Sequence, residues 1–85
     1  MISFSTEGWT DYVYWQDEDR KTLRKINRLF QSIERDGAMS GEGQPEKLRN
    51  KPDTYSRRID EKNRLIYIAA SGNYTIKSCK GHYDD

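Results

Sequence analysis

The chain has 85 residues, a formal net charge of +1 and 12% aromatic residues. This length predicts a single domain spanning 1–85, and the longest apolar run, 65–70, is far shorter than the ~20 residues of a membrane span. One cysteine and one histidine exclude an internal disulfide, a cysteine-based zinc cluster and a multi-histidine metal site, so we expect no metal and no cofactor.

The first half of the chain predicts a short strand followed by two helices. Residues 2–5 alternate apolar and polar side chains, as strands do, and Ser5 or Thr6 then offers a helix N-cap. Apolar side chains three and four residues apart predict the second helix from about Asp19 to Asp36. Gly37 follows as a natural C-cap.

The second half predicts a loop and three strands. Residues 37–54 contain three glycines, Gly37 among them, and two prolines, so they read as a loop, with one helical turn expected at 45–48. Strands are expected at 55–60, 64–70 and 73–80. The resulting order, β-α-α-β-β-β, predicts an α+β fold in which two N-terminal helices pack on one face of a mostly antiparallel four-stranded sheet. The other face would be partly open to solvent.

Basic side chains concentrate in the second half. Residues 44–83 contain nine lysines and arginines against four acidic residues, so an anionic partner would dock there. The overall pI near 7.8 is low for a dedicated nucleic-acid-binding domain. No secretory signal precedes the first strand, and the absence of disulfides fits a reducing compartment, so we expect a cytoplasmic protein.

Two side chains suit proton transfer. His82 is the one group whose ordinary pKa lies close to neutrality, and Gly81 before it permits unusual backbone angles. Glu46 stands in the long loop among basic neighbours that would hold it ionised. The competing interpretations are an exposed histidine near a chain end and a solvated loop carboxylate.

Arginines on neighbouring strands suit phosphate binding. Arg57 and Arg58 precede a tight turn to Arg64, and alternation allows only one of the pair to share a face with a given partner. A sheet edge kept soluble by charge is the alternative. For the first-helix aromatics Trp9, Tyr12 and Trp15, core packing is favoured over base stacking, because Trp9 and Tyr12 fall on one helical stripe. Cys79 is expected to be a small buried residue.

The ordered set of segments resembles the YoeB (Txe) toxins of the RelE-like superfamily. Residues 9–16 (Trp-Thr-Asp-Tyr-Val-Tyr-Trp-Gln) match the N-terminal signature of that family. Further matches follow at 25–27, 41–48, 56–59, 64–67 and 79–83. The similarity implies a RelE-like, microbial RNase-like fold in a toxin of a type II toxin–antitoxin system.

The same resemblance implies a ribosome-dependent mRNA endonuclease that inhibits translation by cutting mRNA in the decoding site. Glu46 matches the general base and His82 the general acid. Arg64 matches the arginine that stabilises the phosphate, Arg58 a further phosphate contact, and Tyr83 the C-terminal tyrosine of the active site. A carboxylate, an imidazole and arginines suffice to activate the 2′-hydroxyl and protonate the leaving oxygen without a metal.

Two departures from the family pattern concern charge. Arg49 stands where lysine is usual, which keeps a substrate-binding charge but changes its geometry. Asp84 and Asp85 extend the chain beyond the usual His-Tyr end and place negative charge near His82.

The resemblance also implies partners: a cognate antitoxin protein, the ribosome and its mRNA, and operator DNA only through the antitoxin complex. Homodimerisation is left open. Two alternative functions remain, a ribosome-independent small RNase and a non-catalytic module that binds an antitoxin or the ribosome. The modest pI disfavours the first, because affinity for free RNA would be weak at physiological salt.

Overall fold

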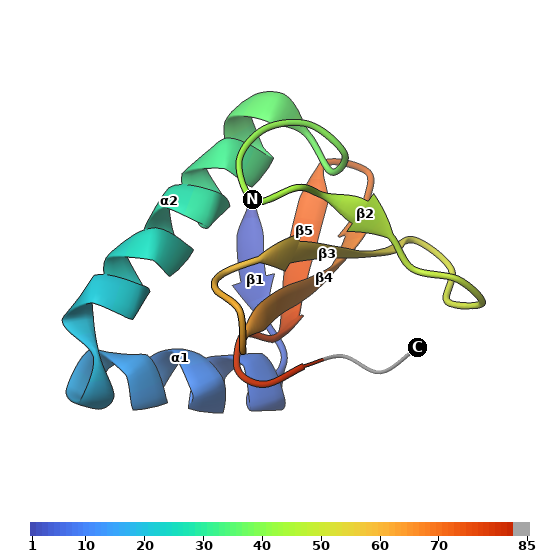
Figure 1. Ribbon diagram of the computed structural model, residues 1–85. Coiled ribbons are helices and arrows are strands. Elements are labelled where there is room, and N and C mark those ends of the chain that lie inside the picture. Colours follow the sequence, from blue (N-terminus) through green and yellow to red (C-terminus); the bar gives the residue numbers. More distant parts are fainter. Residues whose placement is uncertain (83–85) are drawn as a thin grey trace.

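A five-stranded sheet and two helices make up residues 1–82, the part of the chain that the structure describes (Figure 1). In this computed structural model the elements are β1 (Ile2–Phe4), α1 (Thr6–Glu18), α2 (Arg20–Asp36), β2 (Glu46–Lys47), β3 (Thr54–Arg58), β4 (Arg64–Ala70) and β5 (Asn73–Ser78). The predicted α+β class is confirmed. The sheet contains one strand, β2, more than the four that were expected.

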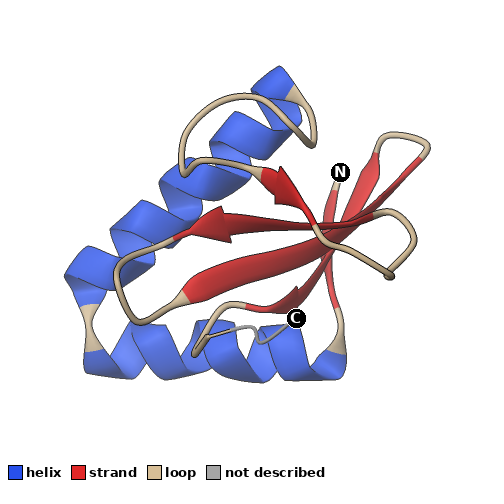
Figure 2. Cartoon of the chain, turned by 45° about the vertical axis from the view of Figure 1, so that its right-hand side comes forward, coloured by secondary structure: helices blue, strands red, loops and turns tan. Residues whose placement is uncertain are grey.

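The strand order in the sheet is β1-β5-β4-β3-β2. The first strand therefore lies beside the last, and this pair is parallel while the other three neighbouring pairs are antiparallel. Figure 2 shows the sheet with both helices on its flank. A mostly antiparallel sheet was expected and is confirmed. The β1–β5 pair can be parallel because a long connection, which includes both helices, joins these two strands.

Strand β2 replaces the helical turn expected at 45–48, which was wrong. Glu46 and Lys47 pair in register with Ser56 and Tyr55 of β3, and the Leu48 N–H donates to the Thr54 carbonyl at 2.9 Å. The free edge of β3 thus supplies hydrogen-bond partners that one isolated helical turn would lack. This pairing places Glu46 on the sheet.

Both helices begin at the predicted caps. The Ser5 hydroxyl accepts the Gly8 N–H at the start of α1, and the Asp19 carboxylate accepts the N–H groups of Lys21 and Thr22 at the start of α2. Gly37 ends α2 with a positive φ of 91°, as a glycine C-cap does. Within residues 1–82, neither helix is long and apolar enough to cross a membrane.

The core lies between α2 and the sheet, with α1 closing it from below (Figure 1). Its buried members come from both helices, the inner strands and the segments after β3 and β5: Trp15, Ile26, Leu29, Phe30, Ile33, Ile59, Leu65, Tyr67, Ile76 and Cys79. Core packing is confirmed for Trp15, which is 8% exposed, and for Tyr12, which packs against the core, but it was wrong for Trp9, which is 52% exposed. Trp9 instead rests edge-on against Phe4, with ring centroids 5.5 Å apart.

Candidate active site

A carboxylate and a guanidinium meet where β2 and β4 flank β3. Arg64, the first residue of β4, directs Nη1 to Oε1 of Glu46 at 3.3 Å. Glu46 is exposed on the edge strand, while the Arg64 side chain is 28% exposed. The pair is accessible to a large substrate, and its partial exposure makes it a weak contributor to stability.

A second guanidinium residue stands opposite the first. Arg58 is the register partner of Arg64 across the β3–β4 pair, so alternation puts both side chains on one face. Like charges directly opposite each other destabilise a sheet. An anion bound between them would relieve that repulsion, which favours a phosphate site over a merely soluble edge.

The C-terminal segment is anchored to α1 by hydrogen bonds. The Cys79 N–H donates to Asp11 Oδ2 at 3.1 Å, and the Cys79 carbonyl accepts the indole N–H of Trp15 at 2.8 Å. Lys80 Nζ lies 4.0 Å from the centre of the Tyr14 ring, a cation–π contact. Helix α1 thereby sets the direction in which the chain approaches His82.

The same segment is also held by the β3–β4 turn. The Gly81 N–H donates to Asn63 Oδ1 at 2.8 Å, and the Gly81 carbonyl accepts the Arg64 N–H at 3.0 Å. His82 Nε2 lies 2.8 Å from the carbonyl oxygen of Glu61. Because a carbonyl can only accept, this contact requires a proton on Nε2.

Asp60 stabilises the turn on which His82 rests. Its Oδ1 accepts the N–H groups of Lys62 and Asn63 at 2.8 Å each. Burial would raise the pKa of Asp60, but these hydrogen bonds outweigh it and the pKa lies below its ordinary value. The turn therefore keeps its capping carboxylate ionised well into the acid range.

Arg64 connects the two halves of the site. Its side chain contacts Glu46 and its main-chain N–H holds Gly81, the residue before His82. The structure thus brings the loop carboxylate, both arginines and the C-terminal imidazole to one end of the sheet. Arg49 lies exposed in the turn beyond β2, and Tyr83 lies outside the described residues.

Arg57 is a buried residue whose role the sequence left undecided. Its side chain is 0% exposed and its neighbour Arg58 is exposed, as strand alternation requires. The guanidinium donates to the hydroxyls of Tyr67 and Ser32 and to three closely bound carbonyls, those of Gly37, Ser40 and Glu42. Arg57 fixes the 37–42 loop, from which the chain continues to Glu46.

Cys79 is an unreactive thiol in the folded protein. It is a free, fully buried cysteine, and burial together with nearby Asp11 raises the pKa of its thiol to about 12. The expectation of a small buried residue is confirmed. A thiolate nucleophile is not available at neutral pH.

Comparison with known proteins gives a consistent family match. The family model described as YoeB-like toxin of bacterial type II toxin-antitoxin system matches residues 4–83. "Toxin YoeB" of Streptomyces coelicolor is 42% identical over 83 residues, which cover 96% of this chain and 98% of the relative. "Toxin YoeB" of Escherichia coli K12 is 40% identical with the same coverage.

Solved structures agree in fold. The YoeB dimer from Staphylococcus aureus superposes with a TM-score of 0.90 at 47% identity, covering 96% of this chain and 95% of that one. The heterotetrameric YoeB–YefM toxin–antitoxin complex from the same organism gives a TM-score of 0.90 at 46% identity, covering 98% and 97%.

Proposed function

The chain belongs to the YoeB-like toxins of bacterial type II toxin–antitoxin systems, and from this membership we propose that it is a ribosome-dependent mRNA endonuclease acting in the decoding site. The observation that carries the proposal is the position of Arg64, which contacts Glu46 through its side chain and the segment of His82 through its main chain. A base, an acid and phosphate ligands at one site are what RNA cleavage by the 2′-hydroxyl needs.

Glu46 acts as the general base in this proposal. Its carboxylate removes the proton of the ribose 2′-hydroxyl, whose oxygen then attacks the adjacent phosphorus. Arg64 and Arg58 bind the phosphate oxygens and stabilise the charge that develops on them. Arg64 exchanges its contact with Glu46 for the stronger contact with phosphate when RNA enters, which leaves the carboxylate free to accept the proton.

His82 acts as the general acid. The 5′-oxygen leaves as its bond to phosphorus breaks, and it receives a proton from the His82 imidazolium, which becomes neutral. For this step His82 Nε2 exchanges its contact with the Glu61 carbonyl for the leaving oxygen. The products are a 2′,3′-cyclic phosphate and a 5′-hydroxyl end. Tyr83 and Arg49 complete the proposed substrate contacts, Tyr83 beside the reacting groups and Arg49 on the RNA backbone.

The partners follow from the family and the site. The chain acts in the cytoplasm on translating ribosomes, and a cognate antitoxin inhibits it, as the S. aureus YoeB–YefM complex illustrates for a relative. Operator DNA is contacted through the antitoxin complex. A homodimer such as that of the S. aureus relative is a second assembly open to this chain.

The test is cleavage of a defined message by the purified protein, with and without translating ribosomes, with the ends mapped by primer extension. Glu46→Gln and His82→Gln should each lower the cleavage rate by ~10²–10⁴-fold. Glu18→Gln, at the exposed end of α1, is the charge-matched control and should cleave like the wild type.

The same experiment separates the alternatives. Equal cleavage of naked mRNA would identify a ribosome-independent RNase. A wild-type protein that binds ribosomes without cutting the message would identify a non-catalytic module. Full activity in both Glu46→Gln and His82→Gln would contradict the assignment of these two residues.

A further inference from the structure

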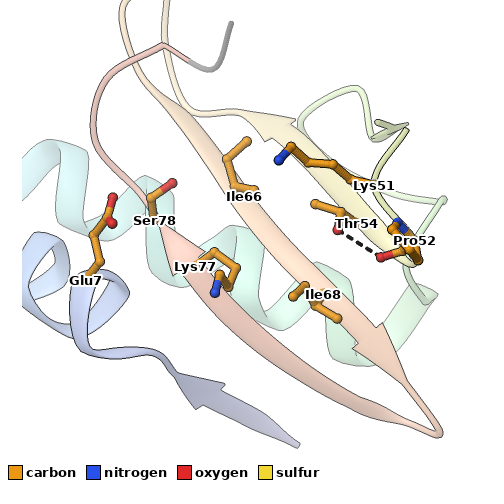
Figure 3. A pocket seen from close by; sticks show the side chains of 8 residues that line it. All are labelled: Glu7, Lys51, Pro52, Thr54, Ile66, Ile68, Lys77 and Ser78. Atoms are coloured by element: carbon orange, nitrogen blue, oxygen red, sulfur yellow. Dashed lines mark hydrogen bonds between the residues drawn. The ribbon is translucent and has the colours of Figure 1, made fainter. Parts of the chain in front are cut away.

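A hollow opens on the face of the sheet that is turned away from α2 (Figure 3). In β4, Ile66 and Ile68 alternate with Leu65 and Tyr67 of the core, so their side chains point to this open face. The hollow has a volume of about 460 Å³, and its walls are Glu7, Lys51, Pro52, Thr54, Ile66, Ile68, Lys77 and Ser78.

The hollow adjoins the candidate active site along the sheet. Ile66 pairs in register with Ser56, and Ser56 pairs with Glu46, so one row of residues runs across three strands from the hollow to the carboxylate. Arg64 lies two residues before Ile66 on the same strand, a step of about 6.6 Å. A chain bound at Arg64 therefore reaches the hollow with its next unit.

The floor of the hollow is apolar and separate from the core. Ile66 is 6% exposed and lies at the bottom of the hollow, although it is not part of the core cluster. Ile68 and Pro52 extend this floor. Flat apolar surfaces of this kind accept the face of a nucleobase, and a few polar groups around them supply specificity.

A β-bulge places an amine at the rim. Tyr67 pairs with Ile76 whereas its neighbour Ile66 pairs with Ser78, so Lys77 is the extra residue of β5. Bulges change the direction of a side chain, and here the side chain of Lys77 lines the hollow (Figure 3). Lys51 adds a second amine from another segment, and Glu7 is the carboxylate among the lining residues.

We propose that this hollow is a base-binding subsite, which holds the nucleotide next to the scissile phosphate with its base on Ile68 and Pro52, above Ile66, and its phosphate on Lys77. This subsite rests on the proposed function, and it is the substrate contact next to the candidate active site. Glu7 accepts N–H groups. Adenine, cytosine and guanine each offer it an exocyclic amine, whereas uracil offers only its ring N3–H, so Glu7 favours the first three over uracil. The phosphate contact positions the RNA, and the base contact determines which nucleotide is preferred.

RNA fits the hollow better than an acidic peptide does. Arg58 and Arg64 beside the hollow and Lys77 at its rim offer cations for a phosphate backbone. A peptide occupant would need main-chain partners, and the sheet offers unpaired backbone at its edges β1 and β2, away from the hollow.

Binding can be measured without catalysis. We would titrate isotope-labelled Glu46→Gln protein with adenosine 5′-monophosphate, with uridine 5′-monophosphate and with inorganic phosphate, and follow the amide resonances by NMR. Adenosine monophosphate should shift the amides of Ile66, Ile68 and Ser78, and phosphate alone should shift Lys77 without the isoleucines. Lys77→Ala should weaken the nucleotide affinity about three- to tenfold, roughly the loss of one charge contact.

The control is Lys21→Ala on α2, which removes an exposed lysine from the other layer and should leave the affinity unchanged. Nucleotide shifts outside the hollow, or an affinity that Lys77→Ala does not change, would overturn the proposal. So would a Lys77→Ala protein that loses affinity for an acidic antitoxin peptide but binds the nucleotide normally, because the hollow would then be a peptide site.

Cleavage of a translated message provides the second readout. Lys77→Ala should raise KM with little change in kcat, and Glu7→Gln should reduce the discrimination against uracil at one position beside the cut. Unchanged base preference and KM in both variants, with an active wild type, would reject the subsite and leave the nuclease standing. An inactive wild type that still binds the nucleotide in the hollow would reject the nuclease instead.

Discussion

The Arg57 Nε–H donates to the Tyr67 hydroxyl at 2.8 Å, and that hydroxyl donates onward to the Ala38 carbonyl at 2.6 Å. Two adjacent strands thus hold the loop after α2 through one chain of hydrogen bonds. Burial raises the pKa of Tyr67 even though Arg57 acts in the opposite direction, so the hydroxyl keeps its proton and its donor role.

Replacing Arg57 with methionine should destabilise the protein by about 3 kcal/mol or more, because several loop carbonyls would lose a buried donor. Tyr67→Phe should cost less, about 1–2 kcal/mol, since it removes one hydroxyl. Urea denaturation followed by tryptophan fluorescence measures both. A loss below about 0.5 kcal/mol in Arg57→Met would show that water replaces the guanidinium without cost.

Arg58→Thr should separate stability from activity. Removing one of two opposed cations and adding a β-branched residue should raise stability by about 0.2–1 kcal/mol. Cleavage should nevertheless fall, because the phosphate loses a ligand. Thermal unfolding and the cleavage assay on the same preparation provide the comparison, and a variant that is both less stable and fully active would contradict the role given to the Arg58–Arg64 pair.

Trp15→Phe tests whether α1 positions the acid. The substitution keeps a buried ring but removes the indole N–H that binds the Cys79 carbonyl. Activity should fall and the protein should stay folded, with the loss confined to the alkaline limb of the pH profile of kcat, where the general acid His82 gives up its proton. Trp9→Phe is the matched control on the exposed side of the same helix. Equal losses in the two variants would point to general destabilisation.

Cys79 should resist alkylation in the folded protein. A thiol with a pKa of about 12 is almost entirely protonated at about pH 8, and its burial blocks access as well. Iodoacetamide should label it only after unfolding in guanidinium chloride, as mass spectrometry would detect. Cys79→Ser should keep activity, and rapid labelling of the native protein would require the C-terminal segment to detach often.

Glu42 should contribute a pH-dependent part of the stability. Hydrogen bonds from Arg28 and Lys25 lower the pKa of its carboxyl from the ordinary 4.5. Because the folded pKa is the lower one, the contribution is present above about pH 4.5 and is lost as the pH falls through the folded value. Urea denaturation between neutral and acid pH should therefore show a smaller loss for Glu42→Gln than for the wild type. If the free energies of unfolding of the two proteins fall in parallel with pH, the acid sensitivity comes from other carboxylates.

The regular elements were predictable because their signals are local. The caps Ser5, Asp19 and Gly37 and the strand Arg64–Ala70 lie where the residue pattern places them. The strands expected at 55–60 and 73–80 end earlier, at Arg58 and Ser78, because the chain turns away from the sheet there. In α1 the buried face carries Gly8 and Trp15, seven residues apart, and Trp9 lies outside that face.

The remaining features depend on contacts that are distant in sequence. Strand β2 has two residues and therefore no periodicity, and it forms only because β3 leaves an edge free. The sequence shows that one of Arg57 and Arg58 points inward, but the acceptors that decide which one lie in the 37–42 loop. The contact between Arg64 and Gly81 likewise has no local signal, because it joins two segments across a turn.

The parallel pairing of β1 with β5 has a consequence for biosynthesis. During translation the first strand emerges more than seventy residues ahead of its neighbour, Tyr74 to Ile76. Helix α1 also cannot dock before β5 is made, because Gly8 packs directly on the Ile76 main chain. A nascent chain cannot complete this sheet before β5 leaves the exit tunnel. The ribosome therefore synthesises all five strands before a fully folded molecule exists.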